Sequence, residues 1–198
     1  GKMVQMYDHR AADVVLNADN LHRAAQPEAI QAALKEQTDR YPVPQFYVRS
    51  EHSSSNPYQW AFGFKEITAP TNARTMIAML LPRAGFGNKV PLLVPQELGD
   101  ADAAKAVALL LANLDSFAFD FVLRQKLQGQ TINLFILEQL PVIAPERFED
   151  CIGATNIADF IREQVLHLSY TAHDLAPFAR DLGYDGPERA LARTEAVL

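Results

Sequence analysis

Residues 113–145 read NLDSFAFDFVLRQKLQGQTINLFILEQLPVIAP and carry more structural information than any other part of the chain. Capping side chains at 113–116 follow one apolar segment and precede another, which predicts a break between two helices. The second helix is expected to run to about Leu127 and to stop at Gly129, because glycine commonly follows a helix. A basic, amide-rich turn comes next, and a short apolar run then ends at Leu140 and Pro141.

The helix before this stretch is expected to begin at Asp100 or Asp102, whose carboxylates can cap it, and to continue through Leu114. Two strand candidates precede it. Residues 60–67 are aromatic and alternating, residues 75–81 are almost continuously apolar, and residues 90–94 are expected to resume the sheet. The pattern predicts an α+β fold: a central mixed or antiparallel sheet with packed helices and a C-terminal helical extension.

Weaker patterns predict the remaining elements. Strands or extended segments are expected at 3–7, 45–49, 131–136 and 139–143, with a polar loop at 53–57. Helices are expected at 27–36, after Asn156, and from a capping-box-like start at 171–174 to Gly183. The apolar face of the helix after Asn156 is expected to consist of Ile157, Phe160, Ile161, Val165 and Leu168.

At 198 residues the chain is long enough for one large domain with its own hydrophobic core. No apolar run reaches the roughly 18 residues of a membrane span. The single cysteine, Cys151, excludes an internal disulfide framework and a cysteine-based zinc cluster, and is expected to be a packing residue. These features fit a reducing cytoplasm and no membrane. The chain opens on Gly-Lys-Met and is expected to be an excised piece of a longer protein.

The net charge of −6 is unevenly distributed. Between Arg40 and Gln96 six basic residues face two acidic ones, and residues 124–135 contain two basic residues and no acidic one. From Ile136 onward eleven acidic residues face five arginines. A basic middle is therefore flanked by acidic segments. From charge alone, ordinary scatter over a solvated surface is an equal alternative.

Signatures of catalysis are absent from the sequence. Gly85-Phe86-Gly87 lacks the third glycine of a phosphate loop and is interpreted as a turn. No histidine pair has metalloprotease spacing, and no serine lies in a nucleophile elbow. Ser55-Asn56-Pro57-Tyr58 is similar to the Asn-Pro-Pro-Tyr motif that holds a flipped base, but it lacks the second proline and is interpreted as a chance match.

Two groups of residues favour DNA binding. The loop after the second strand contains Arg83, Asn88 and Lys89 beside two glycines, which permit close approach to a phosphate backbone. The turn after residue 127 and the helix end before it mix cations with amides: Arg124, Gln125, Lys126, Gln128, Gln130 and Asn133. Cations suit phosphates and guanine, while glutamine and asparagine can pair with the adenine edge. Alternatively, Arg124 and Lys126 only stabilise the helix C-terminus through its macrodipole.

Segments along most of the chain resemble the C-terminal specificity domain of TaqI-like and type IIG restriction–modification DNA methyltransferases. The order of features in 113–145 is one part of the resemblance. The others are the opening GKMVQMYDHRAADVV, Asn72-Ala73-Arg74-Thr75 with Gly87-Asn88-Lys89, and the tail FIREQVLHLSYTAHDLAPFARDLGYDG. The single residues that match the family pattern are Lys2, His9, Arg10, Arg74 and Lys89.

The resemblance implies a DNA recognition module of an adenine-N6 methyltransferase in a restriction–modification or phage-defence system. Residues 1–20 would be the entry segment from a catalytic domain in cis, 21–150 the target-recognition domain and 151–198 the helical extension. The parent enzyme would use S-adenosylmethionine and act with a restriction or defence subunit, and whether it also cleaves DNA stays open. In this chain we expect no cofactor, metal or catalytic residue, and double-stranded DNA as the partner. The residues expected to contact DNA are Arg74, Arg83, Asn88, Lys89, Arg124, Lys126, Gln128, Gln130 and Asn133.

Two other functions stay open. In the first, the chain is a protein-interaction module whose acidic tail, residues 152–198, docks onto the catalytic domain or a partner subunit and leaves little DNA contact. An exposed apolar stripe on that tail would favour this function. In the second, the chain is a small hydrolase that uses His9 and Asp8. Adjacent residues of a strand point to opposite faces, which disfavours that pair.

Overall fold

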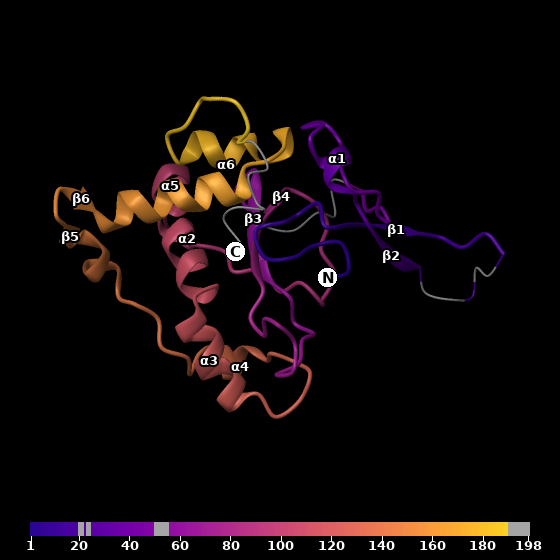
Figure 1. Cartoon of the computed structure of the whole chain (residues 1–198), viewed down its shortest axis with the longest axis horizontal. Coiled ribbons are helices and arrows are strands. Elements are labelled where there is room, and N and C mark those ends of the chain that lie inside the picture. Colours follow the sequence, from indigo (N-terminus) through magenta and orange to yellow (C-terminus); the bar gives the residue numbers. More distant parts are fainter. Residues whose placement is uncertain (20–21, 23–24, 50–55, 190–198) are drawn as a thin grey trace.

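Two antiparallel strands, β3 (Trp60–Phe64) and β4 (Ala78–Pro82), lie at the centre of the computed structural model, which describes residues 1–19, 22, 25–49 and 56–189 (Figure 1). Both are the predicted strands, shortened by a few residues. The expected return of the chain at 90–94 is confirmed as backbone pairing on the other edge of β3, where Leu93 N–H donates to the Phe62 carbonyl at 2.8 Å. A Cβ at Gly63 would lie 2.5 Å from the Pro91 carbonyl oxygen, so the close approach there requires glycine.

The core lies on the face of β3 that carries its alternate aromatic residues, Trp60, Phe62 and Phe64. Helix α2 (Asp100–Leu114) packs on this face through small and branched residues such as Ala104 and Leu111, which are fully buried. Its bounds agree with the prediction, but the cap does not. The N-cap residue is Gly99 and no side chain caps the helix, so Asp100 and Asp102 contribute only negative charge to its first turn.

The tail packs into the same core. Helix α5 (Ile157–Ser169) lies against α2, followed by the short helices η3 (His173–Leu175) and α6 (Ala176–Asp181). Trp60 donates from Nε1 to the Asp181 carboxylate at 2.7 Å and meets the Phe178 ring edge-on, so the predicted extension and the central sheet share one core. The expected start at 171–174 lacks a side-chain cap, whereas Gly183 does follow α6, with a φ of +93°.

The buried face of α5 agrees in part with the expected one: Val165 is buried, and Ile157 and Ile161 pack against the core as predicted. Phe160 is 54% exposed, and the buried positions are Ala158, Val165, Leu166 and Ser169. Ala158 packs with Leu109 of α2 and with Phe148, while Val165 and Leu166 pack in the main core, so the stripe facing these elements is the buried one. Cys151 is also exposed, which corrects the prediction that it is a packing residue.

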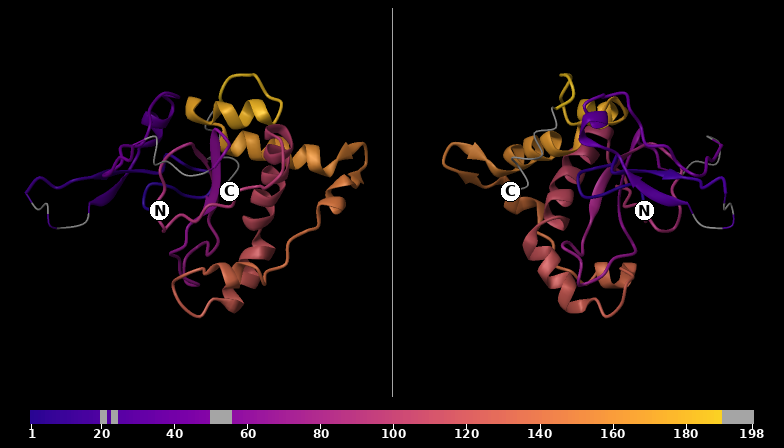
Figure 2. Two further views of the ribbon diagram at one scale, coloured as in Figure 1. Left: turned by 180° about the vertical axis from the view of Figure 1, so that it is seen from behind. Right: turned by 45° about the vertical axis from the view of Figure 1, so that its right-hand side comes forward.

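An arm projects from the body at the N-terminal end. It consists of β1 (Ala12–Val15), β2 (Gln26–Ala29) and α1 (Ala32–Lys35). The arm and the small hairpin of β5 (Cys151–Ile152) and β6 (Thr155–Asn156) lie at opposite ends of the molecule in Figures 1 and 2. Arg10 is fully buried and anchors the arm, because its guanidinium donates to the carbonyls of Lys35, Gln37 and Thr171.

Several local predictions in this part and the next were wrong. Residues 3–7 form a turn region instead of a strand, and 45–49 form no strand. Pro27 lies in β2, opposite Val14, because a two-stranded ribbon tolerates proline where no ladder hydrogen bond is needed. Only 32–35 of the predicted helix at 27–36 are helical. The serine-rich loop at 53–55 and the last residues of the extension, 190–198, lie outside the described residues.

Residues 113–145 supply two further helices, α3 (Phe117–Lys126) and α4 (Leu134–Leu137). A short helix, η2 (Pro145–Glu149), then leads to β5. The break before α3 is confirmed, and Ser116 caps it by accepting from Phe119 N–H at 3.1 Å. Strands or extended segments were predicted at 131–136 and 139–143, and neither range forms a strand. Thr131 forms one bridge to Ile67, and the helical turn of α4 replaces the extended backbone predicted at 134–136.

Within the described residues, no single helix is long and apolar enough to cross a membrane. Helices α2 and α3 pass that test only when they are taken together, and the pair is bent by 63° at the break between them.

Candidate nucleic-acid interface

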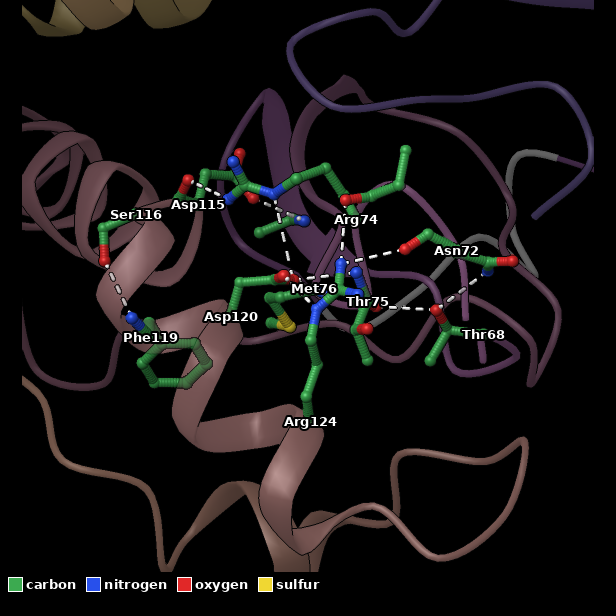
Figure 3. A network of polar contacts seen from close by, with 12 residues as sticks. Thr68, Asn72, Arg74, Thr75, Met76, Asp115, Ser116, Phe119, Asp120 and Arg124 are labelled. Atoms are coloured by element: carbon green, nitrogen blue, oxygen red, sulfur yellow. Dashed lines mark hydrogen bonds and ion pairs between the residues drawn. The ribbon is translucent and has the colours of Figure 1, made fainter. Parts of the chain in front are cut away.

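The position of α3 is fixed by a buried carboxylate that the sequence analysis did not single out. Asp120 is 4% exposed, and its Oδ1 accepts hydrogen bonds from the backbone N–H groups of Thr75 and Met76, both at 2.7 Å (Figure 3). Its Oδ2 accepts from Arg124 Nε, also at 2.7 Å. Burial alone would raise the pKa of Asp120, but these hydrogen bonds outweigh it and hold the pKa below its ordinary value.

Arg124, predicted to contact DNA, contacts the protein itself. Its Nη1 donates to the Pro70 carbonyl at 2.8 Å, and its Nη2 donates to the carbonyls of Asn72 and Ala73 at 2.9 and 2.8 Å. The guanidinium therefore connects α3 to the loop between β3 and β4 (Figure 3). Asp120 and Arg124 are four residues apart on one helix, and this spacing was the signal in the sequence for an internal pair.

Arg74 belongs to the same network. It donates from Nη2 to the Asp115 carbonyl, its Nε lies 3.8 Å from Asp120 Oδ1, and its guanidinium carbon lies 4.6 Å from the centre of the Phe117 ring. Asp115 accepts from Ala78 N–H at 3.0 Å. Burial raises the pKa of Asp115 well above its ordinary value, against this hydrogen bond. The DNA contact predicted for Arg74 and Arg124 stays a prediction, and both side chains are mostly committed to the fold.

Four of the other predicted residues converge on one hollow of about 620 Å³ between the end of α3, the turn after it and α4. They are Lys126, Gln128, Gln130 and Asn133. Gln125 and Gln139 add two more amides, and none of the lining residues is acidic. Gln139 and Phe135, which also line the hollow, were missed because 131–143 was expected to be extended.

Backbone hydrogen bonds hold the turn that carries these amides. Thr68 N–H donates to the Gln130 carbonyl and Ile132 N–H donates to the Glu66 carbonyl, both at 2.9 Å. The turn therefore extends the edge of the central hairpin. At the rim Lys126 Nζ lies 3.4 Å from the side-chain oxygen of Gln139. A side chain set on a paired backbone loses less conformational freedom on binding than one on a free loop.

Lys89 lies beside this turn, because the backbone of Glu66 bonds to both. The Glu66 carbonyl accepts from Ile132 N–H, and the Glu66 N–H donates to the Lys89 carbonyl at 3.3 Å. The exposed Lys89 ammonium pairs with the Glu66 carboxylate at 2.8 Å. Asn88 is its exposed neighbour. Arg83 is separated from them, since it follows Pro82, which pairs with Trp60 at the far end of the hairpin.

The glycines of this loop differ in their surroundings. A Cβ on Gly85 would lie 2.0 Å from a methyl carbon of Val48, so that glycine permits packing of the chain on itself. Gly87 has nothing within 4 Å of such a Cβ. Of the two glycines, Gly87 therefore has the open space that the predicted close approach to a phosphate backbone requires.

The remaining candidates have structural roles. The Asn56 amide donates to the Trp60 carbonyl at 2.6 Å, and the Tyr58 hydroxyl donates to the carbonyls of Pro95 and Leu98. This supports the interpretation of 55–58 as a chance match, with Ser55 outside the described residues.

The hydrolase alternative gains no support from the geometry. His9 is buried and lies 2.8 Å from Asp174, while Asp8 pairs with Lys35 at 2.7 Å, so the carboxylate beside the His9 ring is that of Asp174. Among the described residues, no group of three or more histidine, cysteine or carboxylate side chains is arranged to hold a metal ion.

Comparison of the chain with protein-family models, with curated proteins and with solved structures gives no significant match.

Proposed function

We propose that this chain is a DNA-binding recognition module, and that the amide-lined hollow beside α4 contacts base edges. The observation that carries the proposal is the convergence of six amide and cationic side chains, without a carboxylate among the lining residues, in a protein with a net charge of −6. Glutamine and asparagine amides donate and accept at once, which is what the adenine edge requires. Lys126 and Lys89 are the exposed cations next to them and would contact phosphates.

The resemblance described above supports the same proposal. By that resemblance the module would serve an adenine-N6 methyltransferase of a restriction–modification or phage-defence system. A catalytic domain in the same protein would bind S-adenosylmethionine and modify the base. This chain would position the DNA and would have no methyltransferase or nuclease activity of its own.

The experiment is fluorescence anisotropy of the chain with a randomised duplex pool at about 50 and 200 mM salt. Because each phosphate contact releases counterions, we expect binding to weaken steeply at the higher salt. The Lys126→Ala/Gln130→Ala variant should bind more weakly and reduce the salt slope by about 1. Arg147→Ala, which removes an exposed cation that does not line the hollow, is the matched control. A folded chain that binds no duplex at either salt would refute the proposal.

A specific observation favours protein docking as a second function. The segment 41–48 exposes several large apolar side chains: Tyr41, Val43, Phe46, Tyr47 and Val48. Phe46 and Tyr47 are 78% and 81% exposed, which is typical of an interaction surface. On the tail, where docking was expected, the exposed large apolar residues among those described are Ile152 and Phe160.

The docking function is tested by calorimetric titration with the methyltransferase domain that the resemblance places before this chain. Phe46→Ser/Tyr47→Ser should weaken that association at least tenfold if the segment is the contact. Unchanged association of this variant would remove the segment from the interface.

A further inference from the structure

The outer face of α3 presents aromatic rings to solvent. Phe117 is 81% exposed and Phe121 is 64% exposed, and they are four residues apart, so they lie on one face of the helix. The next residue on this face, Gln125, lines the amide hollow, and Phe135, 60% exposed, lines it from α4. We call Phe117, Phe121 and Phe135 the aromatic face. It lies with α3 and α4 at one end of the molecule, away from the arm (Figure 1).

Few carboxylates of the protein lie near the aromatic face. Between residues 117 and 137 the only acidic residue is Asp120, which is buried and hydrogen-bonded. Lys126 is exposed in the same range, and the Arg74 guanidinium stacks on Phe117. Glu138, exposed at the end of α4, is the next carboxylate along the chain. In a chain with 24 acidic residues, a surface with so few carboxylates beside an exposed lysine is better suited to a polyanion than the acidic segments are.

The Arg74 contact also fixes one ring. With its guanidinium carbon 4.6 Å from the ring centre, Arg74 covers one side of Phe117, and the exposed fraction of 81% leaves the other side open. The arginine is itself held by the Asp115 carbonyl. A ring that is already ordered loses little entropy when a flat ligand stacks on it.

Spacing decides between paired and unpaired bases. Two residues one helical turn apart are separated by about 6 Å along the axis, from a rise of about 1.5 Å per residue. Stacked bases of one strand are separated by only about 3.4 Å. Phe117 and Phe121 can therefore each receive a base only where neighbouring bases no longer stack on each other.

From these observations we infer that the aromatic face binds unpaired nucleobases of DNA by stacking, next to the duplex contacts of the amide hollow. The inference rests on the proposed DNA-binding function for its ligand, and it adds a preference for single-stranded or bulged DNA. Aromatic side chains stack on any base, so this face would contribute affinity with little sequence preference, while the amides supply the sequence preference.

The test measures anisotropy with three labelled probes: a fully paired duplex, the same duplex with a bulged 2-aminopurine, and an oligothymidylate single strand. We expect the bulged duplex to bind more tightly than the paired one, and 2-aminopurine fluorescence to fall as that base stacks. Phe121→Ala should weaken binding to the bulged and single-stranded probes by about 10-fold, the contribution of one stacked base, and change paired-duplex binding less than about 2-fold.

Two control variants separate stacking from general hydrophobic contact. Phe121→Leu keeps an apolar side chain but removes the ring, and it should lose affinity as Phe121→Ala does, whereas Phe121→Trp should retain it. Phe46→Ala removes an exposed ring of the segment 41–48, outside the aromatic face, and should have no effect. Because these side chains are exposed, the variants are expected to fold. The fluorescence of the buried Trp60 reports this for the alanine and leucine variants, and circular dichroism reports it for Phe121→Trp, which carries a second tryptophan.

The outcomes for the two proposals differ. Salt-sensitive duplex binding without preference for the bulged or single-stranded probe, and unchanged by Phe121→Ala, overturns the stacking inference and leaves the DNA-binding function intact. Absence of duplex binding overturns the DNA-binding function. If Phe117→Ala/Phe121→Ala weakens association with the methyltransferase domain and leaves all three probes unaffected, the aromatic face is a protein contact and the inference is wrong.

Discussion

Replacement of Asp120 by alanine tests the central claim about the interface, that its two arginines belong to the fold. The change leaves the N–H groups of Thr75 and Met76 without their acceptor, and both residues are fully buried. Each buried, unsatisfied N–H costs about 1–3 kcal/mol. Arg124 keeps its bonds to three backbone carbonyls and is therefore not left unpaired.

We expect Asp120→Ala to lower the free energy of unfolding by about 2–6 kcal/mol, the combined cost of the two buried N–H groups that lose their acceptor. With a urea slope of about 2 kcal/mol/M, the unfolding midpoint should fall by about 2 M. Trp60 is the only tryptophan, is 1% exposed and bonds to Asp181, so its fluorescence follows loss of the core. Gln125→Ala on the exposed side of α3 is the control and should change stability by less than about 0.5 kcal/mol.

A double-mutant cycle with Arg124→Ala then isolates the pair. We expect a coupling energy between Asp120 and Arg124 of about 1–3 kcal/mol, because the two side chains are in direct contact. A loss below about 1 kcal/mol for Asp120→Ala, or a coupling near zero, would refute the reasoning. Arg124 would then be held too weakly to count as structural, and its original assignment to DNA would regain priority.

Three further changes probe other parts of the fold. Because the pKa of Asp115 is raised in the folded state, the folded protein keeps a proton that the unfolded chain releases once the pH exceeds the ordinary aspartate pKa. Stability should therefore fall as pH rises from that ordinary pKa toward the raised one. Asp115→Asn should remove this dependence and raise the urea midpoint at neutral pH. Gly63→Ala should cost about 1–3 kcal/mol by urea unfolding, because its methyl group would collide with the Pro91 carbonyl, and a neutral result would show that residues 90–93 move freely. Ser116→Ala should cost about 1 kcal/mol, measured the same way, through loss of the cap on Phe119 N–H; an unchanged midpoint would contradict the cap.

Much of the fold was predictable because its signals are local. Each signal lies within a few residues of the element that it predicts. Aromatic residues alternate in 60–67, apolar residues recur at helical spacing in 100–114, and capping residues precede 117 and 157. These segments form the predicted strands and helices almost where expected. The failures fall on short segments such as 3–7 and 134–137, where intrinsic preference is weak and packing decides.

Part of the candidate site was likewise predictable from the sequence, and part was not. The sequence identified a turn rich in amides and cations, and the structure brings Lys126, Gln128, Gln130 and Asn133 together around one hollow. The sequence could not show that Gln139 and Phe135 also line the hollow, since that depends on the helical turn of α4 and on how the chain returns to the hairpin.

By itself, then, the sequence determined the α+β class, the principal strands and helices and the composition of the amide turn. Tertiary structure alone decided which cations face solvent. Arg124 bonds to the Pro70 carbonyl, 54 residues away along the chain, and Arg74 bonds to the Asp115 carbonyl, 41 residues away. The tertiary structure also leaves Phe117 and Phe121 exposed, although phenylalanine is usually buried. Such pairings have no local signal, because the partner groups are backbone carbonyls whose position exists only after the loop and the helix have packed together.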